Sequence, residues 1–373
     1  GRNRSAAGGA VMHCSSGKHF PASRRYQSHM PTLIPRLYCS HSFSPHFNLA
    51  CEEWLFRTRA DNEIIFFTYR NDSSVVLGRN QNPWLEADPG VLRERGVSLV
   101  RRMSGGGTVY HDRGNVNYCF IVPRFLYDPD RFTASVVTIL RQLGVSATKC
   151  ERRTVWVGQR KVSGTAFMLA GQTAMLHGCL LVDTDLDCLQ ACLKPAGGMS
   201  LHGNAVQSIR SDVANLNERD PRITCDAVTE SLRDAFCREF GEGPFVTLDP
   251  HSMESLSRAG FRDFTQKYSS QAWIIGRCPD FSALFADPVD KRIEVLIHTR
   301  RALVTELQIF DRFSCSDSAL FKTQVTREIQ LDFEPRAVAA FLRAELRRMQ
   351  MDEAHRRAAL DAVACIQTFD NFA

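Results

Sequence analysis

Residues 101–120, RRMSGGGTVYHDRGNVNYCF, carry the groups of this chain best suited to binding an anion. Two arginines, Arg101 and Arg102, precede three consecutive glycines, and a strand-like run follows. Glycine lets a backbone pass close to a ligand, and exposed amide N–H groups in such a loop form a concave site for phosphate oxygens. An arginine beside the loop would add charge-assisted hydrogen bonds. The alternative is a tight turn with solvent-facing arginines.

The glycine stretch fits neither common nucleotide-binding motif. No Gly-Lys-Ser/Thr follows it at the spacing of a P-loop. The glycines do not fall as G-x-G-x-x-G, and the run after them predicts a strand rather than a helix, which excludes the dinucleotide fingerprint. The sequence therefore predicts a glycine loop between two strands.

Lys161 is the second candidate group, in the segment RKVSGTAF (160–167). Its neighbours are typical of a strand, where burying an ammonium without an anion is costly. A lysine there suits an anion such as a carboxyl joined to a phosphate. The alternative is an exposed lysine that protects a strand edge from aggregation.

The elements that would position these groups mix strands and helices without regular alternation, which predicts a mixed α/β sheet with helices packed on it. Helices are expected at 46–60 (capped by Asn48), 84–95, 129–143, 335–349 and 353–366. Strands are expected at 63–69 and 73–78 as a hairpin, at 97–102 and 116–122, as two strands around Gly158 within 153–169, at 173–182, and as a hairpin of 292–299 with 302–310.

The length of 373 residues allows about two domains. WIIGRCPDF (273–281) contains a glycine and a proline that mark a domain edge. We therefore expect a catalytic domain over 43–275 and a small α+β domain over 283–373. No stretch approaches the ~20 apolar residues of a membrane helix, so no membrane partner is expected.

The positive net charge of +5 comes from the N-terminal segment. Residues 1–51 hold six basic and no acidic residues, so the remainder has 40 basic against 41 acidic residues and predicts no nucleic-acid partner. An acid-free, basic, serine-rich leader is typical of a transit peptide. We expect residues 1–42 to be a mitochondrial presequence and the mature protein to lie in the matrix; a disordered basic tail is the alternative.

The thirteen cysteines include no C-x-x-C pair and no histidine pair at zinc spacing. Neither a disulfide framework nor a metal site is expected. The pattern favours a reducing compartment, with most cysteines acting as small buried hydrophobic residues.

Taken together, several segments resemble the lipoate–protein ligase and lipoyltransferase family. The resemblance runs in order through residues 46–281, and the leader makes it closest to mitochondrial lipoyltransferases. The matching stretches are FNLACEEWLF (47–56), SSVVLGRNQNPWLE (73–86), RRMSGGGTVYHDRGN (101–115), RKVSGTA (160–166), LHGCLL (176–181), SIRSDVANL (208–216) and WIIGRCPDF (273–281).

The resemblance implies a catalytic fold shared with biotin–protein ligases and a small C-terminal domain. It implies a transferase that passes the lipoyl group of lipoyl-AMP, or of a lipoylated carrier, to a lysine of lipoyl domains. The implied acceptors are the E2 subunits of 2-oxoacid dehydrogenases and the glycine cleavage H protein, and the implied state is a monomer. An activated mixed anhydride needs positioning and cationic stabilisation rather than a Ser-His-Asp triad.

The same resemblance implies the site residues. Lys161 would be the catalytic group and would hold the lipoyl carbonyl and phosphate oxygens. Arg102 and the backbone of Gly107, Thr108, Val109 and Tyr110 would contact the nucleotide. Gly105 and Gly106 would shape a slot for the acyl chain, and His177 would line it, although a core histidine is the plainer interpretation of His177. His111 and Asp112 are expected only to shape the loop.

One segment departs from the family. ATP-using members carry an acidic residue, often as Asn-Asp, shortly before the lysine, whereas this chain has CERRTVWVGQR (150–160) with only Glu151. The departure makes ATP and Mg²⁺ doubtful substrates and favours an already activated lipoyl group. An ATP-dependent lipoate–protein ligase is the alternative.

Three rivals stay open. A biotin–protein ligase would carry Gly-Arg-Gly-Arg where this chain has GRNQNPW. An octanoyl transferase would need a Cys-Lys pair, and no cysteine near Lys161 in the sequence fits. The third rival is a non-catalytic module that binds lipoate or a nucleotide.

Overall fold

The structure is a computed structural model that describes residues 32–195, 199–255, 260–286, 293–311, 321–324, 331–348 and 353–367. Most of the basic leader lies outside the described residues. The last part of the expected 1–42 leader is described and contains the first strand, β1 (Ile34–Ser40). β1 pairs in parallel with two strands of the main sheet, so this part of the chain is built into the fold.

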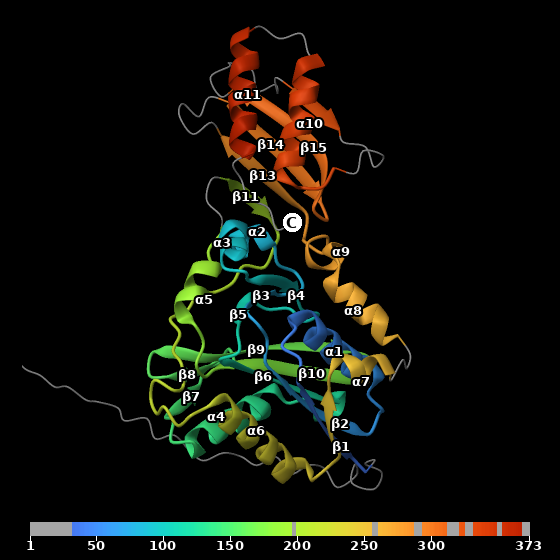
Figure 1. Cartoon of the computed structure of the whole chain (residues 1–373), viewed down its shortest axis with the longest axis vertical. Coiled ribbons are helices and arrows are strands. Elements are labelled where there is room, and N and C mark those ends of the chain that lie inside the picture. The colour runs from blue at the N-terminus through green and yellow to red at the C-terminus, as the bar shows by residue number, and fades with distance from the viewer. Residues whose placement is uncertain are drawn as a thin grey trace, which may run out of the picture. The chain divides into compact units, whose positions relative to one another are not determined.

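An eight-stranded mixed sheet forms the centre of the fold, in the order β12-β1-β2-β6-β10-β9-β8-β7 (Figure 1). Its central strand β6 is buried at every position, which explains why most of its residues are apolar. The expected strands before and after the glycine loop, around Gly158 and at 173–182 are confirmed. The strands after β1 are β2 (Glu63–Tyr69), β6 (Asn115–Pro123), β7 (Ala147–Lys149), β8 (Val155–Val157), β9 (Arg160–Ala170), β10 (Thr173–Leu181) and β12 (Phe245–Leu248).

Two amphipathic helices, α4 (Pro129–Gln142) and α6 (Cys225–Phe240), cover one face of this sheet (Figure 1). Each begins at a side chain that accepts a hydrogen bond from the first turn: Asp128 for α4 and Thr224 for α6. Their apolar residues recur at helical spacing and pack on the sheet in the largest buried cluster.

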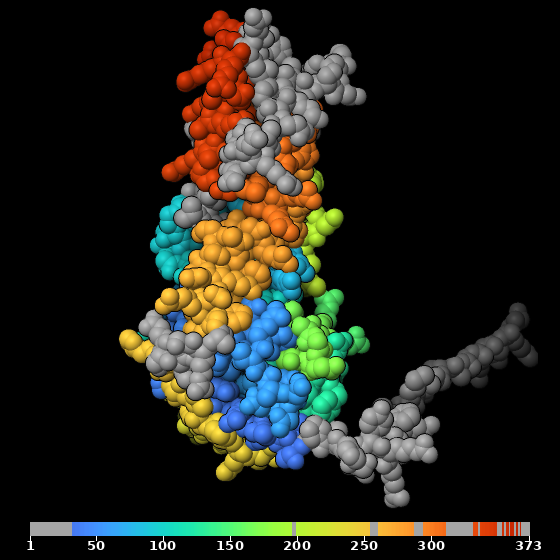
Figure 2. Space-filling model, turned by 90° about the vertical axis from the view of Figure 1, so that its right-hand side faces the viewer, coloured from blue at the N-terminus to red at the C-terminus, as the bar shows by residue number. Residues whose placement is uncertain are grey.

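The opposite face carries α1 (Pro45–Thr58), with α8 (Phe261–Ser269) packed beside it (Figure 2). The Tyr268 hydroxyl donates a hydrogen bond to the buried Glu53 carboxylate of α1 at 2.8 Å. The Lys267 ammonium forms an ion pair with the same carboxylate. Segments about 215 residues apart in the sequence are thereby joined on the face that holds the site.

A second, three-stranded sheet of order β4-β3-β5 lies on the side of α1 (Figure 1). It consists of β3 (Ser74–Leu77), β4 (Ser98–Arg101) and β5 (Val109–His111). The expected hairpin of 63–69 with 73–78 is therefore wrong, because β2 pairs with β1 and β6 while β3 pairs with β4 and β5. The glycine loop is the connection from β4 to β5.

Two helix predictions also need correction. Ser44, not Asn48, caps α1, and Asn48 is a buried residue inside the helix. The expected helix 84–95 is two short helices, α2 (Pro83–Glu86) and α3 (Pro89–Glu94). Asp88 accepts hydrogen bonds from the first turn of α3, and the proline after it cannot continue the preceding helix.

The C-terminal region builds a separate sheet of order β11-β13-β14-β15-β16 with its own buried core. The expected hairpin and the two C-terminal helices are confirmed. Strand β11 comes from the part of the chain before residue 275 and pairs with β13. None of the described helices is both long and apolar enough to cross a bilayer. These elements are β11 (Ser200–Gly203), β13 (Phe281–Ala286), β14 (Ile293–Arg300), β15 (Leu303–Asp311), β16 (Phe321–Gln324), α10 (Pro335–Arg348) and α11 (Glu353–Gln367); the remaining helices are α5 (Leu186–Cys192), α7 (Pro250–Ser255) and α9 (Gln271–Ile274).

Candidate functional site

The register of the main sheet places the candidate side chains on the face that carries α1. Asn117, Cys179 and Gly164 are direct partners across β6, β10 and β9. His177 lies two residues from Cys179 along β10 and therefore on the same face. The alternate residues Leu176 and Leu180 point into the core beneath α4 and α6.

Lys161 is the second residue of β9 and lies next to a second segment of chain. Its backbone N–H donates to Asp212 O at 2.8 Å, and its carbonyl accepts from Ala214 N at 3.1 Å. The side chain lies over Gly164, where an added Cβ atom would approach the Lys161 Nζ to 3.1 Å. Lys161 is half-buried, and its ammonium has no ion pair with the described residues. Because burying an ammonium without an anion is costly, a ligand anion is expected beside it.

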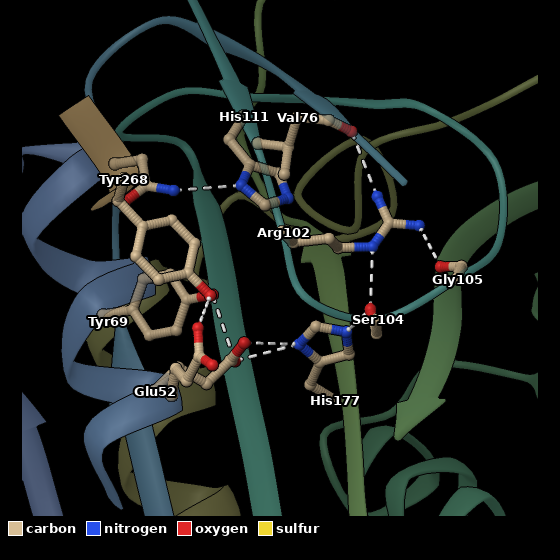
Figure 3. Close-up of polar contacts among 11 residues, drawn as sticks. Glu52, Tyr69, Val76, Arg102, Ser104, Gly105, His111, His177 and Tyr268 are labelled. Carbon is tan, nitrogen blue, oxygen red and sulfur yellow. Dashed lines mark hydrogen bonds and ion pairs between the residues drawn. The ribbon is translucent and has the colours of Figure 1, made fainter. Parts of the chain in front are cut away.

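Arg102 holds the glycine loop together from inside (Figure 3). Its guanidinium is only 5% exposed and donates to Ser104 Oγ and Val76 O at 3.0 Å and to Gly105 O and Gly107 O at 2.7 Å. Burial lowers the pKa of Arg102 to about 10, which leaves it charged at neutral pH. Arg101 is fully buried and bonds to backbone carbonyls, so the alternative of solvent-facing arginines is wrong.

Gln81 and Ser208 secure the far side of the loop. The Gln81 side-chain oxygen accepts from Gly78 N at 2.8 Å and from Thr108 Oγ1 at 2.7 Å. The Ser208 hydroxyl accepts from Thr108 N at 2.7 Å and from Gln81 Nε2 at 3.0 Å. The loop is therefore fixed in place by side chains from both directions, which favours a binding surface formed in advance.

His177 is part of a buried polar chain rather than an isolated core histidine (Figure 3). Its Nε2 lies 2.7 Å from Ser104 Oγ, and its Nδ1 lies 2.9 Å from both carboxylate oxygens of Glu52. Because Arg102 donates to Ser104, the serine proton is free to be donated to His177 Nε2, and Nδ1–H then donates to Glu52. Tyr69 also donates to Glu52, at 3.3 Å. This network couples α1 to the glycine loop.

Two cavities meet at Lys161. The first, of about 540 Å³, is lined by Arg102, Gly106, Gly107, His111 and His177 and extends to Leu49, Tyr69 and Val76. The second, of about 520 Å³, is lined by Tyr110 together with residues of α5 and of segment 208–213. Thr108, Val109, Lys161, Gly164 and Cys179 line both cavities, and Gly105 lines neither. The structure thus brings the predicted residues together, with Gly105 serving as a carbonyl partner of Arg102.

Sequence reasoning missed one cysteine. Cys179 lies opposite Gly164 and lines both cavities, so a thiol does lie near the Lys161 ammonium. Burial raises the pKa of the Cys179 thiol, and the positive charge of Lys161 opposes the shift in part. The two residues are 18 positions apart in sequence, and strand pairing is what brings them together.

Acidic groups are scarce around the cavities. The lining carboxylates are Glu86 and Asp212, both at the 520 Å³ cavity, and Glu86 accepts from Ser208 N at 3.0 Å. Glu151 is exposed and belongs to neither lining, whereas Arg152 lines the 540 Å³ cavity. Within the described ranges no three His, Cys, Asp or Glu side chains are grouped to hold a metal ion. The residues present do not form a protein metal cage, so Mg²⁺ would have to come with a phosphate ligand.

The arrangement combines a slot, which is the 540 Å³ cavity, with the second cavity, and Lys161 lines both. A ligand with an apolar chain and a polar part joined by an anionic group would place that group on Lys161. The cation would then stabilise negative charge that develops on oxygen at the junction.

The chain is similar to one protein family and to several solved structures. A family model described as the lipoyl protein ligase A/B catalytic domain matches residues 44–237, just over half of the chain. The structure of P. falciparum LipL1 in complex with lipoate has 20% identity and a TM-score of 0.58, covering 87% of this chain and 98% of that one. The Thermoplasma acidophilum structure of a bi-partite lipoate protein ligase and its E2 lipoyl domain has 27% identity and a TM-score of 0.53, covering 65% and 96%. A lipoate-protein ligase A bound with ATP has 27% identity and a TM-score of 0.54, covering 65% and 98%.

Proposed function

The chain belongs to the lipoyl protein ligase A/B catalytic domain family, and from this premise we propose that it transfers a lipoyl group from lipoyl-AMP to a lysine of a lipoyl domain. The observation that carries the proposal is Lys161, a lysine without an ion-pair partner among the described residues, at the junction of two cavities. The slot that reaches Leu49 and Val76 would take the acyl chain, and the other cavity would take the nucleotide.

The reaction needs only a positioned donor and an incoming amine. The neutral ε-amine of the acceptor attacks the acyl carbonyl carbon, and an amide bond forms. The bond between that carbon and the phosphate oxygen breaks, AMP leaves, and the amine loses a proton. Lys161 would stabilise the charge on the carbonyl oxygen and on the departing phosphate. The Glu52–His177–Ser104 chain would keep the glycine loop in position against the donor.

Lipoyl domains are the acceptors that this family membership and the T. acidophilum structure of a ligase and its E2 lipoyl domain support. Within this class we propose the E2 subunits of 2-oxoacid dehydrogenases and the glycine cleavage H protein as acceptors, with the enzyme acting as a monomer. The test is to incubate the chain with an unmodified lipoyl domain and weigh the domain by mass spectrometry. Lipoyl-AMP, lipoate with ATP and Mg²⁺, and biotin with ATP are the donors. A non-catalytic binding module would add no mass from any of them.

We expect lipoyl-AMP to be a far better donor than lipoate with ATP and Mg²⁺. The reason is segment 150–154, where an exposed Glu151 and the cavity-lining Arg152 stand in the region that is acidic in ATP-using relatives. The measurement compares initial rates of domain lipoylation from the two donor systems. Equal rates would support the alternative, an ATP-dependent ligase. The ATP-bound structure of a 27% identical lipoate-protein ligase A favours this alternative.

We further propose that the leader directs the protein to the mitochondrial matrix and is removed ahead of β1, because β1 is part of the main sheet. Residues 1–31 fused to a fluorescent protein are expected to bring it into mitochondria, since the segment is basic and free of acidic residues. The matched control replaces Arg2, Arg4, Lys18, Arg24 and Arg25 with glutamine and should leave the reporter in the cytosol. Cytosolic fluorescence from the unmodified fusion would refute the proposal.

A further inference from the structure

Asn117 is a buried polar side chain in the acyl slot. It is 2% exposed, lines the 540 Å³ cavity, and its amide nitrogen has no hydrogen-bond partner among the described residues. Most buried polar groups in folded proteins have a partner, and leaving one unpaired costs free energy. An unpaired amide on a residue that lines a binding cavity therefore indicates a ligand with a group that can reach it.

His111 supplies a second unpaired donor to the same cavity. Asn48 Nδ2 donates to Ser42 O at 2.9 Å and to Asn71 Oδ1 at 2.9 Å, which fixes the orientation of the Asn71 amide. Asn71 Nδ2 then donates to His111 Nδ1 at 3.0 Å, so the ring proton is on Nε2. Burial, together with the positive charge of Arg102, lowers the pKa of His111 to about 3, which keeps the ring neutral. None of the hydrogen bonds among the described residues uses His111 Nε2.

The position of Asn117 along the slot matches the far end of an acyl chain. Asn117, Cys179 and Gly164 lie on three neighbouring strands, about 4.8 Å apart each, so Asn117 is about 9.6 Å from the strand under Lys161. A lipoyl group with its carbonyl at Lys161 has five carbon–carbon bonds of about 1.5 Å each before its ring. In an extended zigzag they span roughly 6 Å, and the dithiolane ring covers the remaining distance.

We propose that Asn117, assisted by His111, recognises the dithiolane ring and makes the slot selective for lipoyl over saturated acyl groups of similar length. This inference rests on the proposed function. Sulfur is a weak hydrogen-bond acceptor that can receive the two unpaired N–H donors. The methyl end of an octanoyl chain offers no acceptor and would leave both donors unpaired in an apolar slot. A site with polar groups rejects an analogue that lacks the matching group.

The test is a competition between equal concentrations of lipoyl-AMP and octanoyl-AMP for one unmodified lipoyl domain, read by intact mass. The wild-type chain should yield mainly lipoylated domain. Asn117→Leu, which keeps the branched shape and removes the amide, should shift the product ratio toward octanoyl by about tenfold. Because both donors compete for the same enzyme molecules, the ratio does not depend on how much of the variant is folded.

The matched control is Asn217→Leu, an asparagine outside both cavities that bonds to Asp183, and its ratio should equal that of the wild type. Should Asn117→Leu yield no folded protein, Asn117→Ser and His111→Leu are read in the same way. A wild-type ratio in the Asn117 and His111 variants overturns the inference. Absence of both products with the wild-type chain overturns the proposed function instead.

Discussion

Lys161→Ala is expected to slow lipoyl transfer by roughly a hundredfold or more while the protein stays folded. The acyl carbonyl carbon and the phosphorus of the donor share one bridging oxygen, so a single ammonium over Gly164 can reach both the carbonyl oxygen and the phosphate. Removing such a transition-state donor commonly costs on the order of 3 kcal/mol. The fold should not suffer, because the described residues offer the Lys161 ammonium no ion pair to lose.

The measurement is single-turnover transfer from preformed lipoyl-AMP, together with a thermal melt. Lys161→Arg should restore little activity, because a broad planar guanidinium does not replace a compact ammonium. Lys149→Ala is the matched control, since this lysine pairs with Asp130 on the surface and lines neither cavity. An alanine variant that melts normally and transfers at the wild-type rate would show that Lys161 is an ordinary strand lysine.

Gly78→Ala is expected to reduce transfer by about a hundredfold through displacement of the glycine loop. A Cβ atom at Gly78 would lie 2.1 Å from the carbonyl oxygen of Gly106, closer than any real contact, so the loop backbone must move. Displacing binding groups by about 1 Å can cost on the order of a hundredfold in rate. The loop is also fixed by Arg102 and Gln81, so the shift would spread to its hydrogen bonds.

The matched control is Gly243→Ala, where a Cβ atom would lie 2.1 Å from Pro35 O beside the main-sheet edge. The steric conflict is the same, but the site lies outside both cavities. Both variants should melt at a lower temperature, and only Gly78→Ala should lose transfer per folded molecule. Similar losses in the two variants would show that general destabilisation, and not loop position, controls the rate.

Local patterns in the sequence predicted the main elements of the fold. Elements whose signal depends only on nearby residues are confirmed. They are the strands β6 and β10, from their apolar runs, and the helix α4, from its helical spacing. The hairpin of 63–69 with 73–78 was wrong because Asn71 and Asp72 read as an ordinary turn. In the structure the chain passes from one sheet to another there, and Asn71 is a fully buried amide. Turn composition alone does not say which sheet a strand joins.

The part of the site that was predictable consists of residue types that are unusual in their local sequence. A lysine in a strand and a run of glycines were candidate binding groups, each with a structural alternative, and the cavities do contain Lys161, Gly106 and Gly107. The contact of Glu52 with His177 spans 125 residues, and no local pattern encodes it. Asn117 carried a signal that was overlooked, since it is a lone amide inside the apolar run VNYCFIV.

The bonding of Arg102 also depends on tertiary structure. An arginine beside the glycines could bind a phosphate or could hold the loop in place, so the residue type alone does not distinguish the two roles. The carbonyls that receive its hydrogen bonds come from β3 and from the loop itself. A buried guanidinium that fixes the loop explains why an arginine precedes these glycines, and its contact with a nucleotide stays a prediction.

The most direct measurement is the intact mass of an unmodified lipoyl domain after one turnover with wild-type enzyme and a limiting amount of lipoyl-AMP. We expect one lipoyl group on the acceptor lysine, formed much faster than without enzyme, and no such acceleration with Lys161→Ala. An unchanged domain mass with folded wild-type enzyme, or equal acceleration by the alanine variant, would contradict this expectation.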